Sequence, residues 1–171
     1  MRIVKISTKE QSELYAEHFN KIAKCNLPSN VFKNSDTLMI EKCGKPIGGM
    51  CVISDINHFR VLRQIPYTVK LPAKINEFAE ITGFWFSSKS ALVFSMFFII
   101  LLRLVLFSRK KYFIYSYGHS NFKLREYYSV GCPIRIYSGV MSTGACENVE
   151  CLGKVGLLAI CFRGIFAKIG T

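Results

Sequence analysis

The stretch of sequence that decides the fold runs from Phe78 to Gly139 and reads FAEITGFWFSSKSALVFSMFFIILLRLVLFSRKKYFIYSYGHSNFKLREYYSVGCPIRIYSG. Segments rich in aromatic and β-branched residues, which are typical of strands, alternate in it with two segments of helical character. In order, they predict a strand over 78–86, a helix over 91–107, a strand over 112–116, a helix over 121–130 and a strand over 134–137. We therefore expect an α/β (α+β) protein with a mixed central sheet flanked by helices.

The flanking segments extend this pattern on both sides. Before the central stretch we expect a strand (3–6), a helix (8–25), a two-stranded hairpin (37–41 and 46–54) that turns at Gly44, and an irregular excursion (55–74). After it we expect a loop (139–153) and a last strand (155–162). The length of 171 residues suits one domain, so residues 1–171 are predicted to form a single domain.

The apolar run from Ala91 to Phe107 has two interpretations. It is at the short end of what spans a bilayer, and Arg103 interrupts it. A helix buried against a sheet is equally apolar, and the strands expected on either side favour that interpretation. A single-pass membrane anchor remains the alternative.

Composition limits the partners and the compartment. The formal net charge of +12 suggests an acidic partner, but no helix combines a basic face with base-reading residues, so nucleic acid is not expected. Seven cysteines without a CxxC pair, and a polar beginning of the chain, favour a reducing cytoplasm. The three histidines do not stand at ligand spacing, so no metal is expected.

Short motifs in the central stretch resemble those of one enzyme family. The segment FKLREYYSVGCPIRIYSG, through Gly131, Pro133 and Arg135, resembles the acyl-homoserine-lactone synthases, and EITGF resembles their Glu-x-Ser/Thr-Arg-Phe strand. The related N-acyl amino acid synthases share the outline. The resemblance implies the GNAT-like acyl-CoA N-acyltransferase fold over about residues 8–162.

The chain departs from the family pattern at three places. Gly83 stands where the family has the arginine of the Glu-x-Ser/Thr-Arg motif, and Cys51 stands where it has the arginine of an earlier Gly-x-x-Arg strand. The acidic pair expected before the hairpin is reduced to Asp36. Since those groups organise the family's amino substrate site, S-adenosylmethionine is not implied as the acceptor here.

The resemblance implies transfer of an acyl group from a thioester to a small amine or amino acid. The donor that it implies is acyl carrier protein phosphopantetheine or acyl-coenzyme A. Glu80 is the expected general base, and Tyr127 is the expected acid for the leaving thiolate, with Tyr128 as its rival. The expected substrate-binding residues are Thr82, Phe84, Trp85, Phe86 and Tyr115. The phosphate is expected at the loop that opens the apolar helix, where backbone N–H groups attract anions, and this loop consists of Ser87, Ser88, Lys89 and Ser90.

Two other functions stay open at this point. A GNAT-shaped module without catalysis, serving in binding or regulation, is compatible with the missing arginines and with a loop that lacks the glycine-rich form of coenzyme A acetyltransferases. A small protein anchored to membrane by the 91–107 helix is the other alternative.

Overall fold

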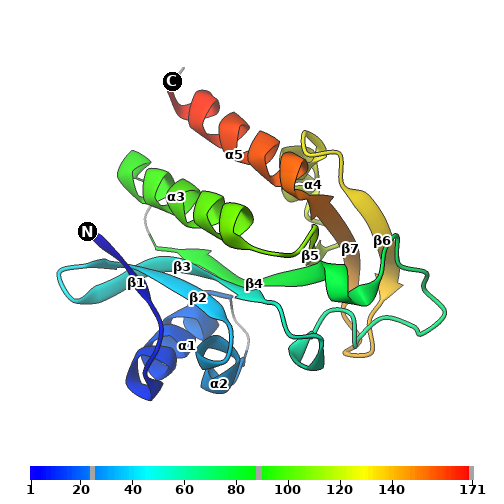
Figure 1. Ribbon diagram of the computed structural model, residues 1–171, viewed down its shortest axis with the longest axis horizontal. Coiled ribbons are helices and arrows are strands. Elements are labelled where there is room, and N and C mark those ends of the chain that lie inside the picture. The colour runs from blue at the N-terminus through cyan, green and yellow to red at the C-terminus, as the bar shows by residue number, and fades with distance from the viewer. Residues whose placement is uncertain (24–25, 88–89, 170–171) are drawn as a thin grey trace. The chain divides into compact units, whose positions relative to one another are not determined.

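The computed structural model describes residues 1–23, 26–87 and 90–169 (Figure 1). Seven strands form one mixed sheet in the order β1-β2-β3-β4-β5-β7-β6. The chain divides into two compact units, one of Met1–Ile53 with Ile81–Leu104 and one of Ser54–Glu80 with Val105–Thr171. The boundary crosses strand β4 (Phe78–Phe86) after Glu80.

The first unit begins with an antiparallel sheet. Strands β1 (Arg2–Lys5), β2 (Asp36–Lys42) and β3 (Lys45–Ile53) pair in sequence order. The predicted hairpin is confirmed, because β2 and β3 are joined by a two-residue turn in which Cys43 and Gly44 have φ of 50° and 76°. Two consecutive positive φ angles match the twist of the flanking strands, and Gly44 adopts its own without the steric cost that a side chain brings.

Two helices cover one side of this sheet, α1 (Lys9–Ala23) and α2 (Ser29–Lys33), as Figure 1 shows. The start of α1 is a capping box, in which the Gln11 N–H donates to Thr8 Oγ1 and the Gln11 side chain accepts from the Thr8 N–H. The helix buries Tyr15 and Phe19, whose rings contact Phe32 of α2. The sequence did not predict α2, which is only five residues long.

Helix α3 (Ala91–Phe107) lies on the opposite side of the first unit's sheet from α1 and α2 (Figure 1). Val93 and Ile100 are fully buried, and Phe97 contacts Phe84 of β4 at a ring centroid distance of 4.4 Å. The predicted packing against a sheet is therefore confirmed. Within residues 1–23, 26–87 and 90–169, no helix has the length and apolar character needed to cross a bilayer.

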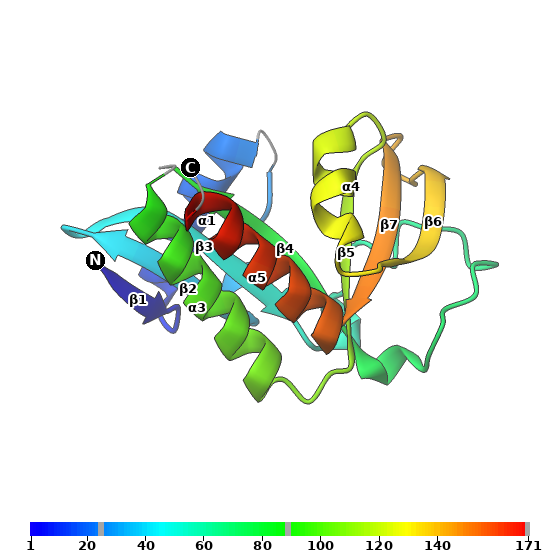
Figure 2. The same ribbon diagram turned by 90° about the horizontal axis from the view of Figure 1, so that it is seen from above.

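The second unit contains the remaining strands, β5 (Tyr112–Gly118), β6 (Ile134–Val140) and β7 (Cys146–Gly153). The start of β4 pairs in parallel with β5, β5 pairs with β7 and β7 with β6 in antiparallel fashion. The excursion that precedes β4 holds two short 3-10 helices (Ile56–His58 and Ile75–Glu77) and extends past β6 (Figure 2). It is tied to the β6–β7 connection by a hydrogen bond from the Ser142 N–H to the Gln64 carbonyl.

Two predictions for the end of the chain are wrong. The expected strand over 155–162 lies in the first part of helix α5 (Lys154–Ile169), and the expected loop over 139–153 contains the whole of β7. The segment VGLLAICF is apolar throughout, and periodicity alone does not separate a buried strand from a buried helix in so short a run. The β7 segment was missed because buried Glu150 and Asn148 give it the appearance of a polar loop.

Candidate active site

Glu80 is a buried carboxylate near the start of β4. Its side chain is fully buried, and its Oε2 atom accepts hydrogen bonds from the backbone N–H groups of Arg60 and Val61, at 2.8 and 2.9 Å. These donors belong to the irregular excursion of the second unit, whose conformation places two consecutive N–H groups at one carboxylate oxygen. The other oxygen, Oε1, has no hydrogen-bond partner among the described residues. A buried carboxylate oxygen without a partner is costly, so it calls for a functional explanation.

Burial raises the pKa of the Glu80 carboxyl above its ordinary value, because desolvation disfavours the charged form. The N–H groups of Val61 and Arg60 and the charge of Arg60 act in the opposite direction but do not cancel the effect of burial. A carboxylate with a raised pKa is a stronger base near neutral pH than an exposed one.

Beyond Glu80, the predicted substrate residues of β4 point in different directions. Phe84 contacts Phe86 and the Phe97 ring of α3, and its side chain remains 41% exposed. Trp85 is buried on the other side, where its ring meets Tyr15 and stacks on His18 of α1. Thr82 is partly buried. Phe84 and Phe86 are therefore together on one surface, and Trp85 is part of the core beneath α1.

The two positions at which the family carries arginines lie against each other. Gly83 has φ of 61°, and a Cβ atom placed on it would lie 2.7 Å from Cε1 of Phe32 and 3.3 Å from Cβ of Cys51. Cys51 and Phe32 are fully buried, and the Gly83 carbonyl accepts a hydrogen bond from the Tyr15 hydroxyl at 2.7 Å. An arginine at position 83 does not fit this packing. Aromatic core occupies the place of the family's charged groups.

The loop predicted to bind phosphate is only partly described. Ser88 and Lys89 lie outside the described residues. The Ser87 N–H and hydroxyl both donate to the Ile47 carbonyl, at 2.8 and 3.1 Å, which ties this residue to β3. Ser90 caps α3, since its Oγ accepts from the Val93 N–H at 3.3 Å. The phosphate assignment stays a prediction.

Helix α4 (Phe122–Ser129) carries the two tyrosines considered as the acid. Tyr128 contacts the ring of Tyr115 on β5 at 4.6 Å, and burial raises its pKa to about 12. Tyr127 is 36% exposed and contacts Tyr128 edge to face. Because Glu80 is registered with Ile114, and neighbouring residues of a strand face opposite sides, Glu80 and the Tyr115–Tyr128 pair lie on opposite faces of the sheet of the second unit.

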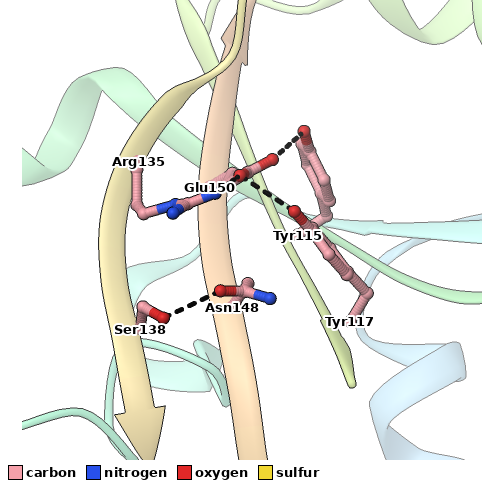
Figure 3. Close-up of polar contacts among 6 residues, drawn as sticks. All are labelled: Tyr115, Tyr117, Arg135, Ser138, Asn148 and Glu150. Carbon is pink, nitrogen blue, oxygen red and sulfur yellow. Dashed lines mark hydrogen bonds and ion pairs between the residues drawn. The ribbon is translucent and has the colours of Figure 1, made fainter. Parts of the chain in front are cut away.

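A second buried carboxylate, which the sequence analysis missed, is Glu150 on β7 (Figure 3). Its two oxygens accept hydrogen bonds from the hydroxyls of Tyr115 and Tyr117, at 3.0 and 2.9 Å, and from the Arg135 guanidinium at 3.2 Å. Burial, followed by the proximity of Glu150, raises the pKa of Tyr115 and Tyr117. Both tyrosines therefore stay protonated as donors. The alternation of tyrosines in YFIYSYG was the signal for one polar face on β5.

A bulge on β6 completes this cluster. The register between β6 and β7 shifts between Arg135 and Tyr137, so Arg135 and Ser138 reach the same face although they are three residues apart. The Ser138 hydroxyl donates to Asn148 at 2.9 Å (Figure 3). Beside the cluster is an open pocket of about 320 Å³, lined by Arg125, Ser129, Pro133, Arg135 and Glu150. No group of three or more potential metal ligands occurs in the described part of the chain.

Comparisons with solved structures identify the fold. FeeM, an N-acyl amino acid synthase from uncultured soil microbes, is matched over 90% of this chain and 95% of its own, with a TM-score of 0.65 and 13% identity. The AHL synthase LasI is matched over 97% and 95%, with a TM-score of 0.60 and 12% identity. Diaminobutyrate acetyltransferase EctA from Paenibacillus lautus, solved with its substrate and coenzyme A, is matched over 90% and 96%, with a TM-score of 0.58 and 9% identity.

These matches show that the chain has the GNAT N-acyltransferase fold, as the sequence motifs implied. No protein-family model and no curated protein sequence matches the chain. The assignment therefore rests on the fold and on the residues of this chain.

Proposed function

We propose that the protein is an N-acyltransferase that moves an acyl group from a thioester, carried by acyl carrier protein or coenzyme A, to a small amine or amino acid. The observation that carries the proposal is Glu80. On a fold whose solved neighbours are N-acyltransferases, it is a buried carboxylate with a raised pKa and one unpartnered oxygen.

In the proposed reaction, Glu80 removes a proton from the acceptor's ammonium group, directly or through a water. The amine nitrogen then attacks the thioester carbonyl carbon and forms the new C–N bond. The tetrahedral intermediate collapses, the C–S bond breaks, and the thiolate takes a proton from Tyr127 or Tyr128 of α4, while the nitrogen gives up its second proton, which returns through solvent to that tyrosine. The amine then approaches from the Glu80 face of the sheet, and the sulfur leaves toward the α4 face. The N–H groups of Arg60 and Val61 keep the carboxylate in place during these steps.

The acyl chain is proposed to lie along Phe84 and Phe86. Phe84 is an exposed aromatic side chain on a strand, and its ring contacts with Phe86 and Phe97 make an apolar surface. The buried apolar packing of Gly83 and Cys51 supports an acceptor other than S-adenosylmethionine, because the family's arginines are absent from that place.

The test is mass spectrometry of organic extracts from cells that express the wild type, Glu80→Gln or Glu77→Gln. The matched control is Glu77, a carboxylate three residues earlier that pairs with Lys111 and is partly exposed. Loss of a general base costs about 10²- to 10⁴-fold in rate. We expect an N-acylated amine in wild type and Glu77→Gln that falls by at least about 100-fold in Glu80→Gln.

The acyl group and amine in that product would identify the donor chain and the acceptor together. Equal product in wild type and Glu80→Gln would remove Glu80 from the mechanism. Extracts without any new acylated amine would leave the non-catalytic binding module as the better account.

A further inference from the structure

Helix α3 is apolar on the side that faces away from its sheet as well as on the side that packs on it. Exposed positions recur at helical spacing along the helix, at Leu92, Ser95, Ile99, Arg103 and Leu106. Leu92, Ile99 and Leu106 are 59%, 52% and 61% exposed, and Phe107 at the end of the helix is 82% exposed. A surface helix ordinarily carries polar residues on its outer side, so this exposed stripe requires a partner that is itself apolar.

The charge around the stripe indicates what that partner is. Between residues 81 and 125 the sequence contains no Asp or Glu. The same segment contains seven basic residues, which are Lys89, Arg103, Arg109, Lys110, Lys111, Lys123 and Arg125. A protein partner that covers an apolar stripe does not require such a one-sided charge, whereas an anionic lipid surface combines an apolar interior with a negative boundary.

Individual residues fit this arrangement. Arg103 is exposed within the stripe, where a long side chain can keep its methylene groups in the apolar layer and its guanidinium among headgroups. Arg109 is exposed just beyond the end of the helix. Lys111 pairs with Glu77, so it contributes less positive charge than its neighbours. The helix of 17 residues is about 25 Å long, which lets it lie along a bilayer surface over several turns.

We propose that the exposed stripe of α3 (Leu92, Ser95, Ile99, Arg103 and Leu106), with Phe107 beside it, is a docking surface for an anionic lipid bilayer. The helix lies in the interface, with its inner side still packed on the sheet of the first unit. This arrangement needs no spanning segment. It is independent of the acyl transfer proposed above, because it does not involve Glu80 or the α4 tyrosines.

The test is co-sedimentation of the purified full chain with vesicles of phosphatidylcholine alone or of phosphatidylcholine mixed with phosphatidylglycerol. We expect binding to the mixed vesicles that weakens as salt is raised, and at least about tenfold weaker binding to the neutral ones. Ile99→Glu is expected to weaken binding by at least about tenfold, since it places a charge in the apolar layer.

Ile22→Glu is the matched control, because Ile22 is also an isoleucine on a helix surface, 46% exposed, and the charge change is the same. Vesicle binding by Arg103→Gln is likewise compared with that by Lys21→Gln, because each change removes one positive charge from the exposed side of a helix. Circular dichroism and sedimentation equilibrium of each variant establish that it is folded and report its oligomeric state.

Three results would overturn the proposal. One is equal binding of wild type to neutral and anionic vesicles, and another is an equal loss of vesicle binding in Ile99→Glu and Ile22→Glu. The third is self-association of the wild type that Ile99→Glu abolishes without any vesicle binding, which would make a second copy of the chain the occupant of the stripe.

Discussion

Replacement of Gly83 by alanine tests the packing that takes the place of the family's arginines. Two costs add at this position. A left-handed φ costs an L-residue about 1–2 kcal/mol, which is partly offset by about 0.4–1 kcal/mol because alanine restricts the unfolded chain more than glycine does. The new Cβ also meets the Phe32 ring at 2.7 Å, and overpacking of a core costs about 1–3 kcal/mol.

Gly44 is the matched control, because its φ of 76° is similar and nothing lies within 4 Å of a Cβ built on it. Gly44→Ala therefore carries the conformational cost alone. We expect Gly83→Ala to lower the free energy of unfolding by about 1–3 kcal/mol more than Gly44→Ala does. With a urea m-value of about 2 kcal/mol/M, the unfolding midpoint of Gly83→Ala is expected to lie about 0.5–1.5 M below that of Gly44→Ala.

The assay is urea unfolding followed by the fluorescence of Trp85, whose ring lies against Tyr15 and His18 beside this packing. An equal decrease in the free energy of unfolding in the two variants would show that position 83 has room for a side chain. The inference that the family's arginine cannot be accommodated here would then be wrong.

Three further predictions concern the polar groups. The melting temperature of Glu80→Gln relative to wild type is expected to rise as pH increases from the ordinary pKa of glutamate to the raised pKa of folded Glu80, and to stay level above it. In that window the unfolded wild type ionises while the folded state still holds its proton, so wild type loses stability, and a difference that is flat across this window would contradict the prediction. Tyr127→Phe and Tyr128→Phe are expected to differ in the kcat of acyl transfer, which falls by about 10²-fold or more only in the variant that lacks the acid. Equal kcat values in the two variants would exclude both α4 tyrosines as the acid for the leaving thiolate. Glu150→Gln is expected to lower the free energy of unfolding by about 1–3 kcal/mol, because Arg135 and two tyrosine hydroxyls lose a charged acceptor, whereas Glu147→Gln on the same strand is expected to have little effect in thermal unfolding.

The local sequence was sufficient for the central elements of the fold. Strong signals that depend on neighbouring residues predicted β4, α3, β5 and the β2–β3 hairpin: aromatic and β-branched runs, an apolar segment of helical length, and a turn with Gly44. Short motifs were also sufficient to single out Glu80 and to imply the fold. Periodicity failed for α5 and β7. The apolar run in α5 suggested a strand, and the buried carboxylate in β7 suggested a loop.

The tertiary structure decided what the candidate site contains. Glu150 gathers Tyr115, Tyr117 and Arg135 from two other strands, and a bulge on β6 sets which side chains share its face. Likewise, only folding brings Phe32 and Cys51 against Gly83, and only the excursion before β4 supplies two N–H groups to Glu80. These contacts join residues about 15 to 50 positions apart, and strand register and bulges set them. Local propensity acts over a few residues, so the sequence by itself determined the central elements and singled out Glu80, whereas the partners of each polar group were decided by how the strands align.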